Sequence, residues 1–180
     1  MVPAGTYFLS IDGEAGEFGT VNLSVPLGGT VVGENGTITI VSDPTLGFCS
    51  ARTYPEDTTL LFVTGANSVA GDGTESYLIV NSGLQIIDGD DLDSDDDKSI
   101  DPTRGVLAAD GFAVAVDAAA EAAYAPVIYD AAQNEGGGEE LPDAASRCPG
   151  NSGPMNAAAW FYGALEEINS FGSSDLLAFT

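Results

Sequence analysis

The residues of this chain with the most readily named chemistry are its two cysteines, Cys49 and Cys148. A disulfide between them would close a loop of about 100 residues and stabilise the fold by roughly 4–5 kcal/mol in the chain-entropy model. The alternative is two buried thiols. Because each cysteine lies beside turn-forming residues rather than inside a long apolar run, we favour the disulfide. Such a bond indicates exposure to an oxidising exterior.

Alternating carboxylates suggest a second kind of chemistry, since calcium-binding loops use the same spacing. The alternating residues are Asp91, Asp93, Asp95 and Asp97. An EF-hand counted from Asp91 has Asp96 at the sixth position, where glycine is needed, and Pro102 at the twelfth, where glutamate is needed. We therefore expect residues 88–101 to be a solvated acidic loop, too charged to pack, and we predict no metal site. Loose cation binding is the alternative.

No motif in the sequence supplies complete catalytic machinery. Residues 148–154 resemble the nucleophile segment of trypsin-like proteases, but the chain has no histidine to act as the base for Ser152. The lack of histidine also excludes His-ligated zinc and ordinary haem sites, and no P-loop or dinucleotide fingerprint is present. Among 28 acidic residues, some pair will always suit glycoside hydrolysis. We expect no enzyme, no cofactor and no small-molecule substrate; an acid-dependent hydrolase is the enzymatic alternative.

The charge balance is extreme. The chain has 180 residues with 28 Asp and Glu against 4 Lys and Arg, so its formal net charge is −24. Four scattered cations cannot grip a phosphate backbone, which excludes direct nucleic-acid binding. Hydrophobic residues nevertheless make up 44% of the chain, so we expect it to fold rather than remain disordered. High salt would screen the repulsion, because the Debye length falls from about 10 Å at 0.1 M to about 3 Å at 1 M.

Over most of the chain, the sequence pattern predicts short strands separated by turns that contain Gly, Pro, Asn and Asp. The expected strands cover residues 6–11, 20–25, 30–32, 37–41, 47–51, 60–63, 77–80, 84–87, 112–116 and 126–129. Alternation in the second strand places Val21, Leu23 and Val25 on one face. The Asn35-Gly36 pair predicts a hairpin between residues 30–32 and 37–41. We predict one all-β domain over residues 1–180, a single jelly roll or a β-sandwich or barrel, with a C-terminal α-helix.

The C-terminal part changes character. A glycine-rich connection covers residues 133–140, and Ser152 with Pro154 signals the start of a helix over about residues 154–169. This helix is apolar almost all round, which requires burial on two sides. It is either sunk between the sheet and a long loop or buried in a subunit contact. The subunit-contact candidates are Met155, Trp160, Phe161, Tyr162, Leu165, Ile168 and Phe171.

Near-loss of lysine beside many acids is typical of proteins from halophilic archaea and their viruses. In its size, strand-rich pattern and acidity, the whole chain resembles the smaller major capsid protein of icosahedral haloarchaeal viruses with an internal membrane. The resemblance implies an upright jelly roll, homo-oligomers, contact with a second coat protein, proximity to a viral internal membrane and a virion location in an extracellular high-salt environment. No diagnostic motif carries it.

Two alternatives remain open. One is a capsid decoration protein of a haloarchaeal tailed virus. The other is a cell-surface or secreted β-domain of a halophile that binds carbohydrate or protein. The sequence begins without the basic and apolar regions of a secretory signal, and no stretch approaches the roughly 20 apolar residues of a membrane span. Glycosylation sequons occur at Asn22 and Asn35, but such triplets arise often by chance.

Overall fold

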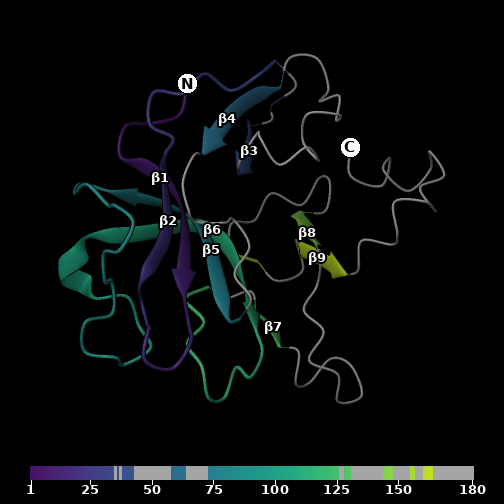
Figure 1. The fold of residues 1–180 in the computed structure, drawn as a ribbon. Helices are drawn as coiled ribbons and strands as arrows, with labels where there is room; N and C mark the ends of the chain where they lie inside the picture. Colours follow the sequence, from purple (N-terminus) through teal and green to yellow (C-terminus); the bar gives the residue numbers. More distant parts are fainter. Residues whose placement is uncertain are drawn as a thin grey trace.

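The computed structural model describes residues 1–34, 36, 38–42, 58–63, 73–125, 128–130, 144–147, 155–156 and 160–163. Within these ranges the chain is built from strands and one 3-10 turn, η1 (Pro102–Arg104), so the predicted all-β class is confirmed. The central element is a five-stranded sheet in the order β2-β1-β5-β6-β7 (Figure 1). Its strands are β1 (Thr6–Asp12), β2 (Val21–Pro26), β5 (Glu75–Ser82), β6 (Val106–Ala115) and β7 (Ile128–Asp130).

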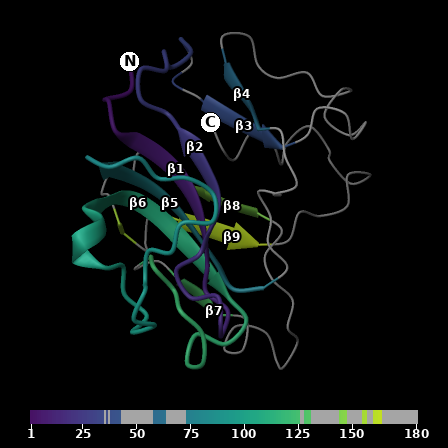
Figure 2. The same ribbon diagram turned by 60° about the vertical axis from the view of Figure 1, so that its left-hand side comes forward.

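Neighbouring strands of this sheet pair antiparallel, except β6 and β7, which pair parallel. Two further pairs accompany it. The strands β3 (Ile38–Ser42) and β4 (Thr59–Val63) form a parallel pair, and β8 (Ala144–Arg147) and β9 (Trp160–Gly163) form an antiparallel one. Figure 2 shows the β3–β4 pair beside one end of β1 and β2. A jelly-roll arrangement of these strands stays a prediction.

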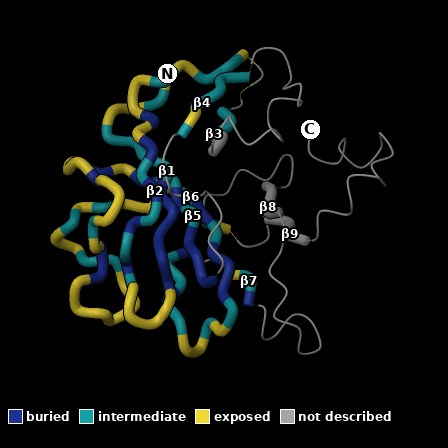
Figure 3. The backbone as a smooth tube through the Cα atoms, viewed as in Figure 1, coloured by how far each residue is buried: buried dark blue, intermediate teal, exposed yellow. Residues whose placement is uncertain are grey.

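Alternate residues of the central strands enter hydrophobic clusters on opposite faces of the sheet. On one face Leu9 of β1 lies opposite Leu78 of β5, and both are fully buried. The loops after β5 and β6 cover this face with Ile86, Leu92 and Ala125. On the other face, residues of the β3–β4 pair pack against β2 and its end: Ile40, Leu61 and Val63 against Leu23, Val25 and Leu27. Figure 3 shows the buried positions concentrated along β1, β2, β5 and β6.

A β-bulge corrects the expectation that Val21, Leu23 and Val25 share one face. Ile11 pairs with Val21 and Ser10 pairs with Leu23, so Asn22 is an extra residue in β2. All three apolar residues are buried, as predicted. The bulge, however, sends Val21 into the cluster of Leu9 and sends Leu23 and Val25 into the opposite one. The simple period of two fails because one residue is added.

The predicted Asn35-Gly36 hairpin is wrong. Residues 30–32 are not a strand, and Val31 is 64% exposed. The strand β3 pairs instead with β4 in parallel, and the Thr59 hydroxyl donates to the Val31 carbonyl at 2.7 Å. Burial of Ile40 and Leu61 over β2 thus decides the partner of β3 against the local turn signal. Residues 84–87, also predicted as a strand, form an irregular strap that lies along β2.

The predicted helix over about residues 154–169 is also wrong where the chain is described. Met155 has a φ of +52°, which a right-handed helix does not allow. Residues Trp160–Gly163 form strand β9, which pairs with β8 so that Trp160 lies opposite Arg147. Aromatic residues favour strands, and a pairing partner distant in sequence is invisible to helical periodicity. The described part of the chain contains no helix long and apolar enough to cross a membrane.

Candidate functional site

The acidic loop is held tightly against the beginning of β2. Val21 donates its N–H to the Asp90 carbonyl and Leu92 donates to the Gly19 carbonyl, at 2.8 and 2.9 Å. Thr20 and Asp91 form an isolated β-bridge in the same segment. Leu92 is 2% exposed and enters the cluster of Leu9. The expectation that residues 88–101 are too charged to pack is therefore wrong for this half of the loop.

Asp93 anchors the loop from inside the protein. It has no exposed surface, and its two carboxylate oxygens accept different donors. The Tyr124 hydroxyl donates to Oδ2 at 2.8 Å, and the Asp97 N–H donates to Oδ1 at 3.0 Å. Burial, together with the hydrogen bond to Asp93, raises the pKa of the Tyr124 hydroxyl, so this group stays a donor. Tyr124 belongs to the loop after β6, so this bond joins two loops at one end of the sheet.

Three carboxylates of the loop converge: Asp93, Asp95 and Asp97 present oxygens that lie within 4.8 Å of one another. Repulsion, first from Asp97, raises the pKa of the exposed Asp95 carboxyl. The single lysine of the chain, Lys98, points elsewhere. Its ammonium donates to the Ala120 carbonyl at 2.9 Å and lies 5.7 Å from the centre of the Phe18 ring. Among the described residues, no amino or guanidinium group pairs with these three carboxylates.

A different starting residue gives this loop a closer match to the calcium template than the count from Asp91. Counted from Asp93, aspartates occupy positions one, three, five and nine, the last being Asp101. The sixth position is Lys98, whose φ of +67° is the left-handed conformation that glycine supplies in the template. The twelfth position is Arg104 instead of a bidentate glutamate. These residues could hold a hard cation through carboxylate oxygens, with an incomplete protein shell.

Counted from Asp93, the ninth position (Asp101) is hydrogen-bonded to the second position (Ser94). Asp101 Oδ2 accepts the Ser94 hydroxyl at 2.6 Å and the Ser94 N–H at 3.1 Å. These hydrogen bonds hold the pKa of the Asp101 carboxyl below its usual value. The form of Asp101 that accepts these hydrogen bonds from Ser94 is the ionised carboxylate.

A second group of polar side chains is buried at the bulge of β2. Glu75 is 3% exposed and accepts hydrogen bonds from the Ser10 hydroxyl and, at 3.2 Å, from the Asn22 amide. The same amide lies 3.4 Å from Asp12 Oδ2, so it bridges two carboxylates. Burial raises the pKa of Glu75, and the nearby charges of Asp12 and Glu14 act in the same direction. The side-chain amide of the half-buried Asn22, the first residue of a sequon, is thus engaged in hydrogen bonds within the protein.

The structure describes few of the residues singled out from the sequence. Met155 lies beside β6, where its N–H donates to Asp110 Oδ1 at 3.1 Å. Trp160, Phe161 and Tyr162 belong to β9. The remaining candidates fall outside the described residues, as does the glycine-rich stretch 133–140: Cys49, Cys148, Leu165, Ile168 and Phe171. Local sequence patterns did not indicate the Asp93–Tyr124 bond or the Glu75 cluster, because both join residues more than 30 positions apart.

Comparisons with known proteins returned no match to a family model, a characterised protein or a solved structure.

Proposed function

We propose that this chain is a structural subunit of the virion of a halophilic archaeal virus. It acts by assembly in high salt, with copies of itself and with a second coat protein, rather than by catalysis. In this proposal the strand framework is part of a jelly roll that serves as a rigid wall in the shell. A decoration protein on the head of a haloarchaeal tailed virus would use the same properties.

One observation carries the proposal, namely an exposed apolar run at the beginning of β6. Val106 is half-buried, Leu107 is 71% exposed, and Ala108 and Ala109 are exposed. Successive strand residues point to opposite faces, so this run is apolar on both sides. Val106 packs against the cluster of Leu9, but the three exposed apolar residues that follow it are unfavourable on a surface unless a partner covers them. Met155, a contact candidate from the sequence, lies beside the same strand.

The charge of the chain explains why such a contact would need brine. With a net charge of −24, two copies repel each other strongly in dilute buffer. At molar salt the electrostatic repulsion between copies is screened within about 3 Å, so apolar contacts can hold the copies together. An acidic wall without a basic arm also suits a shell whose genome is kept behind lipid.

Substitution of Leu107 tests the proposal. In about 3 M KCl we expect light scattering to show a defined multimer for the natural chain and a smaller species for Leu107→Ser, because Leu107 lies in the contact. Val31→Ser is the matched control: Val31 is 64% exposed, and the change keeps the net charge. Circular dichroism should be unchanged in both variants, since neither side chain is in the core. A natural chain that is monomeric in brine would overturn the proposal, and equal sizes of all three would exclude the β6 contact.

A further inference from the structure

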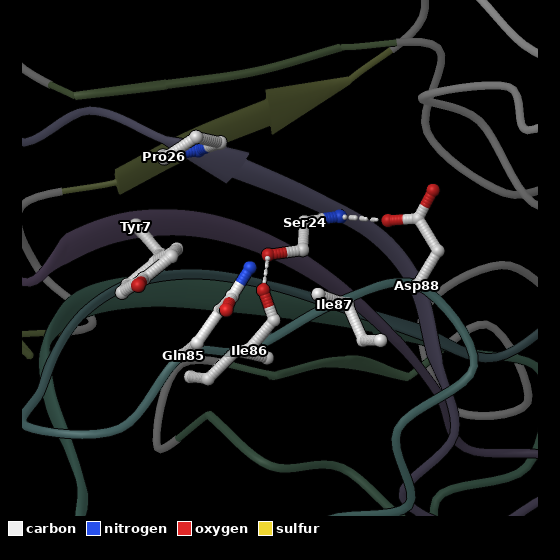
Figure 4. A pocket seen from close by; sticks show the side chains of 7 residues that line it. All are labelled: Tyr7, Ser24, Pro26, Gln85, Ile86, Ile87 and Asp88. Carbon is white, nitrogen blue, oxygen red and sulfur yellow. Dashed lines mark hydrogen bonds between the residues drawn. The ribbon is translucent and has the colours of Figure 1, made fainter.

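A depression of about 630 Å³ opens between β1, β2 and the strap that follows β5 (Figure 4). Its described lining comes from Tyr7 of β1, Ser24 and Pro26 of β2, and Gln85–Asp88 of the strap. The volume lies in the range of sites that hold small ligands. Its described lining includes neither the acidic trio (Asp93, Asp95 and Asp97) nor the apolar run of β6.

The walls of this depression are fixed by bonds within the protein. The Ser24 hydroxyl donates to the Ile86 carbonyl at 2.8 Å, and the Ser24 N–H donates to Asp88 Oδ1 at 2.7 Å. Ile86 is 5% exposed and belongs to the cluster of Leu9. The strap therefore cannot shift without breaking two hydrogen bonds and lifting a core residue. A ligand would meet a preformed surface and would lose little free energy to ordering it.

Two polar groups in the depression remain open for a ligand. Neither the Tyr7 hydroxyl nor the Gln85 side-chain amide makes a hydrogen bond in the part of the chain that the structure describes, and Gln85 is exposed. Figure 4 shows these two side chains next to each other at one end of the depression, with Ile87 and Asp88 at the other. The amide offers both donors and an acceptor, and the tyrosine adds an aromatic ring with a polar tip. Pro26 and the 54% exposed Ile87 supply apolar contact.

These groups select the class of ligand. No lysine or arginine is found among the described residues that line the depression, and the chain carries −24, so phosphates and other anions are disfavoured. In brine, charge attraction would add little for a cation, whereas hydrogen bonds and apolar contacts persist. A saccharide presents hydroxyl groups and an apolar C–H face together. We propose that this depression binds a neutral sugar residue, with its C–H face on Tyr7 and Pro26 and its hydroxyls at the Gln85 amide. This inference shares the high-salt premise of the proposed function but does not depend on assembly.

Calorimetric titration in about 3 M KCl tests the inference with maltose, lactose, cellobiose, chitobiose and methyl mannoside as ligands. We expect at least one to bind with a Kd below about 10 mM, and Gln85→Ala and Tyr7→Phe each to weaken that binding by about threefold to tenfold. Leu84→Ala is the matched control, because Leu84 is 57% exposed at the first position of the strap and lies outside the lining.

Absence of binding by all five sugars would overturn the inference, and so would binding that both lining variants leave unchanged. The multimer measured by light scattering should be the same size in Gln85→Ala as in the natural chain. If no sugar binds, the sugar-binding inference fails and the assembly proposal is unaffected. If the natural chain is monomeric in brine but binds a sugar, the assembly proposal fails and the sugar-binding inference is supported.

Discussion

At the scale of single residues, the protein buries carboxylates without basic partners among the described residues. Asp93 is satisfied by one hydroxyl and one backbone N–H, and Glu75 by one hydroxyl and one amide. Buried polar groups need such partners, because an unmade hydrogen bond costs about 1–3 kcal/mol. Neutral donors satisfy the oxygens but do not cancel the charge. An ionised Glu75 close to Asp12 and Glu14 is therefore costly.

Glu75→Gln should stabilise the protein at pH 7. Because the folded-state pKa of Glu75 is raised, its contribution to stability is fully present below the unfolded pKa and is lost as the pH rises through the folded pKa. At pH 7 folding of the natural chain therefore requires either a buried carboxylate or the uptake of a proton, whereas the glutamine is neutral and its oxygen still accepts from Ser10. We expect a gain on the order of 1 kcal/mol, or about 2–4 °C in Tm for a chain of this size.

Thermal unfolding at pH 7 and at about pH 4 checks this expectation, and the gain should shrink at the lower pH, which lies below the raised pKa of Glu75. Glu17→Gln removes the same charge from an exposed position and should change Tm little. A Glu75→Gln protein that is less stable than the natural chain at pH 7, or equally shifted at both pH values, would contradict the assignment.

At the scale of elements, loops rather than helices complete the core on one face of the sheet. The acidic loop crosses the turn before β2 so closely that Gly19 is required there. Its φ is +76°, and a Cβ at this position would lie 2.5 Å from the Cβ of Asp93. The same turn accepts the N–H of Leu92. The position of the acidic trio is therefore set by a close approach between two loops.

Gly19→Ala should cost considerably more stability than Gly29→Ala. Both glycines have a positive φ, which costs an alanine about 1–2 kcal/mol, but a Cβ at Gly29 meets no atom within 4 Å. The difference between the two variants therefore isolates the clash with Asp93, which we expect to add at least about 1–2 kcal/mol. Urea unfolding in molar KCl measures both. Equal losses would show that the acidic loop moves aside without cost.

At the scale of the whole molecule, acidic residues outnumber basic residues 28 to 4, so the cations cannot neutralise them. The central sheet has covered faces, and the segment from Ile86 to Leu92 shields β2, the strand at one end of its order. Association through β2 is thus hindered, which leaves the exposed run of β6 as the strand segment best suited to a partner.

Dialysis from about 3 M to 0.1 M KCl should dissociate the proposed assembly, because the screening length grows from a few Å to about 10 Å and like charges on neighbouring copies then repel. Light scattering before and after dialysis follows the size, and restored KCl should restore it. Particles that keep their size in dilute buffer without divalent cations would contradict the role of screening.

Composition and local patterning determined a substantial part of this protein. Strands β1 to β5, the second half of β6 and part of β7 were predictable, because alternating or continuous apolar runs between turn residues leave few other options. Residues 106–111 of β6 were not predicted as a strand. The net charge of −24 requires only counting. The calcium-like spacing of the acidic loop was also visible, and choosing Asp93 as the first position would have revealed its closer match.

Tertiary structure alone decided which residues meet. The bulge at Asn22 divided one apolar stripe between two faces, β4 rather than a hairpin supplied the partner of β3, and β8 drew residues 160–163 into a strand. Likewise, burial of Asp93 under Tyr124 and of Glu75 beside Asn22 follows from contacts across 31 and 53 positions. Periodicity reports the preference of one segment at a time, whereas pairing and burial depend on free energies shared by segments far apart in the chain.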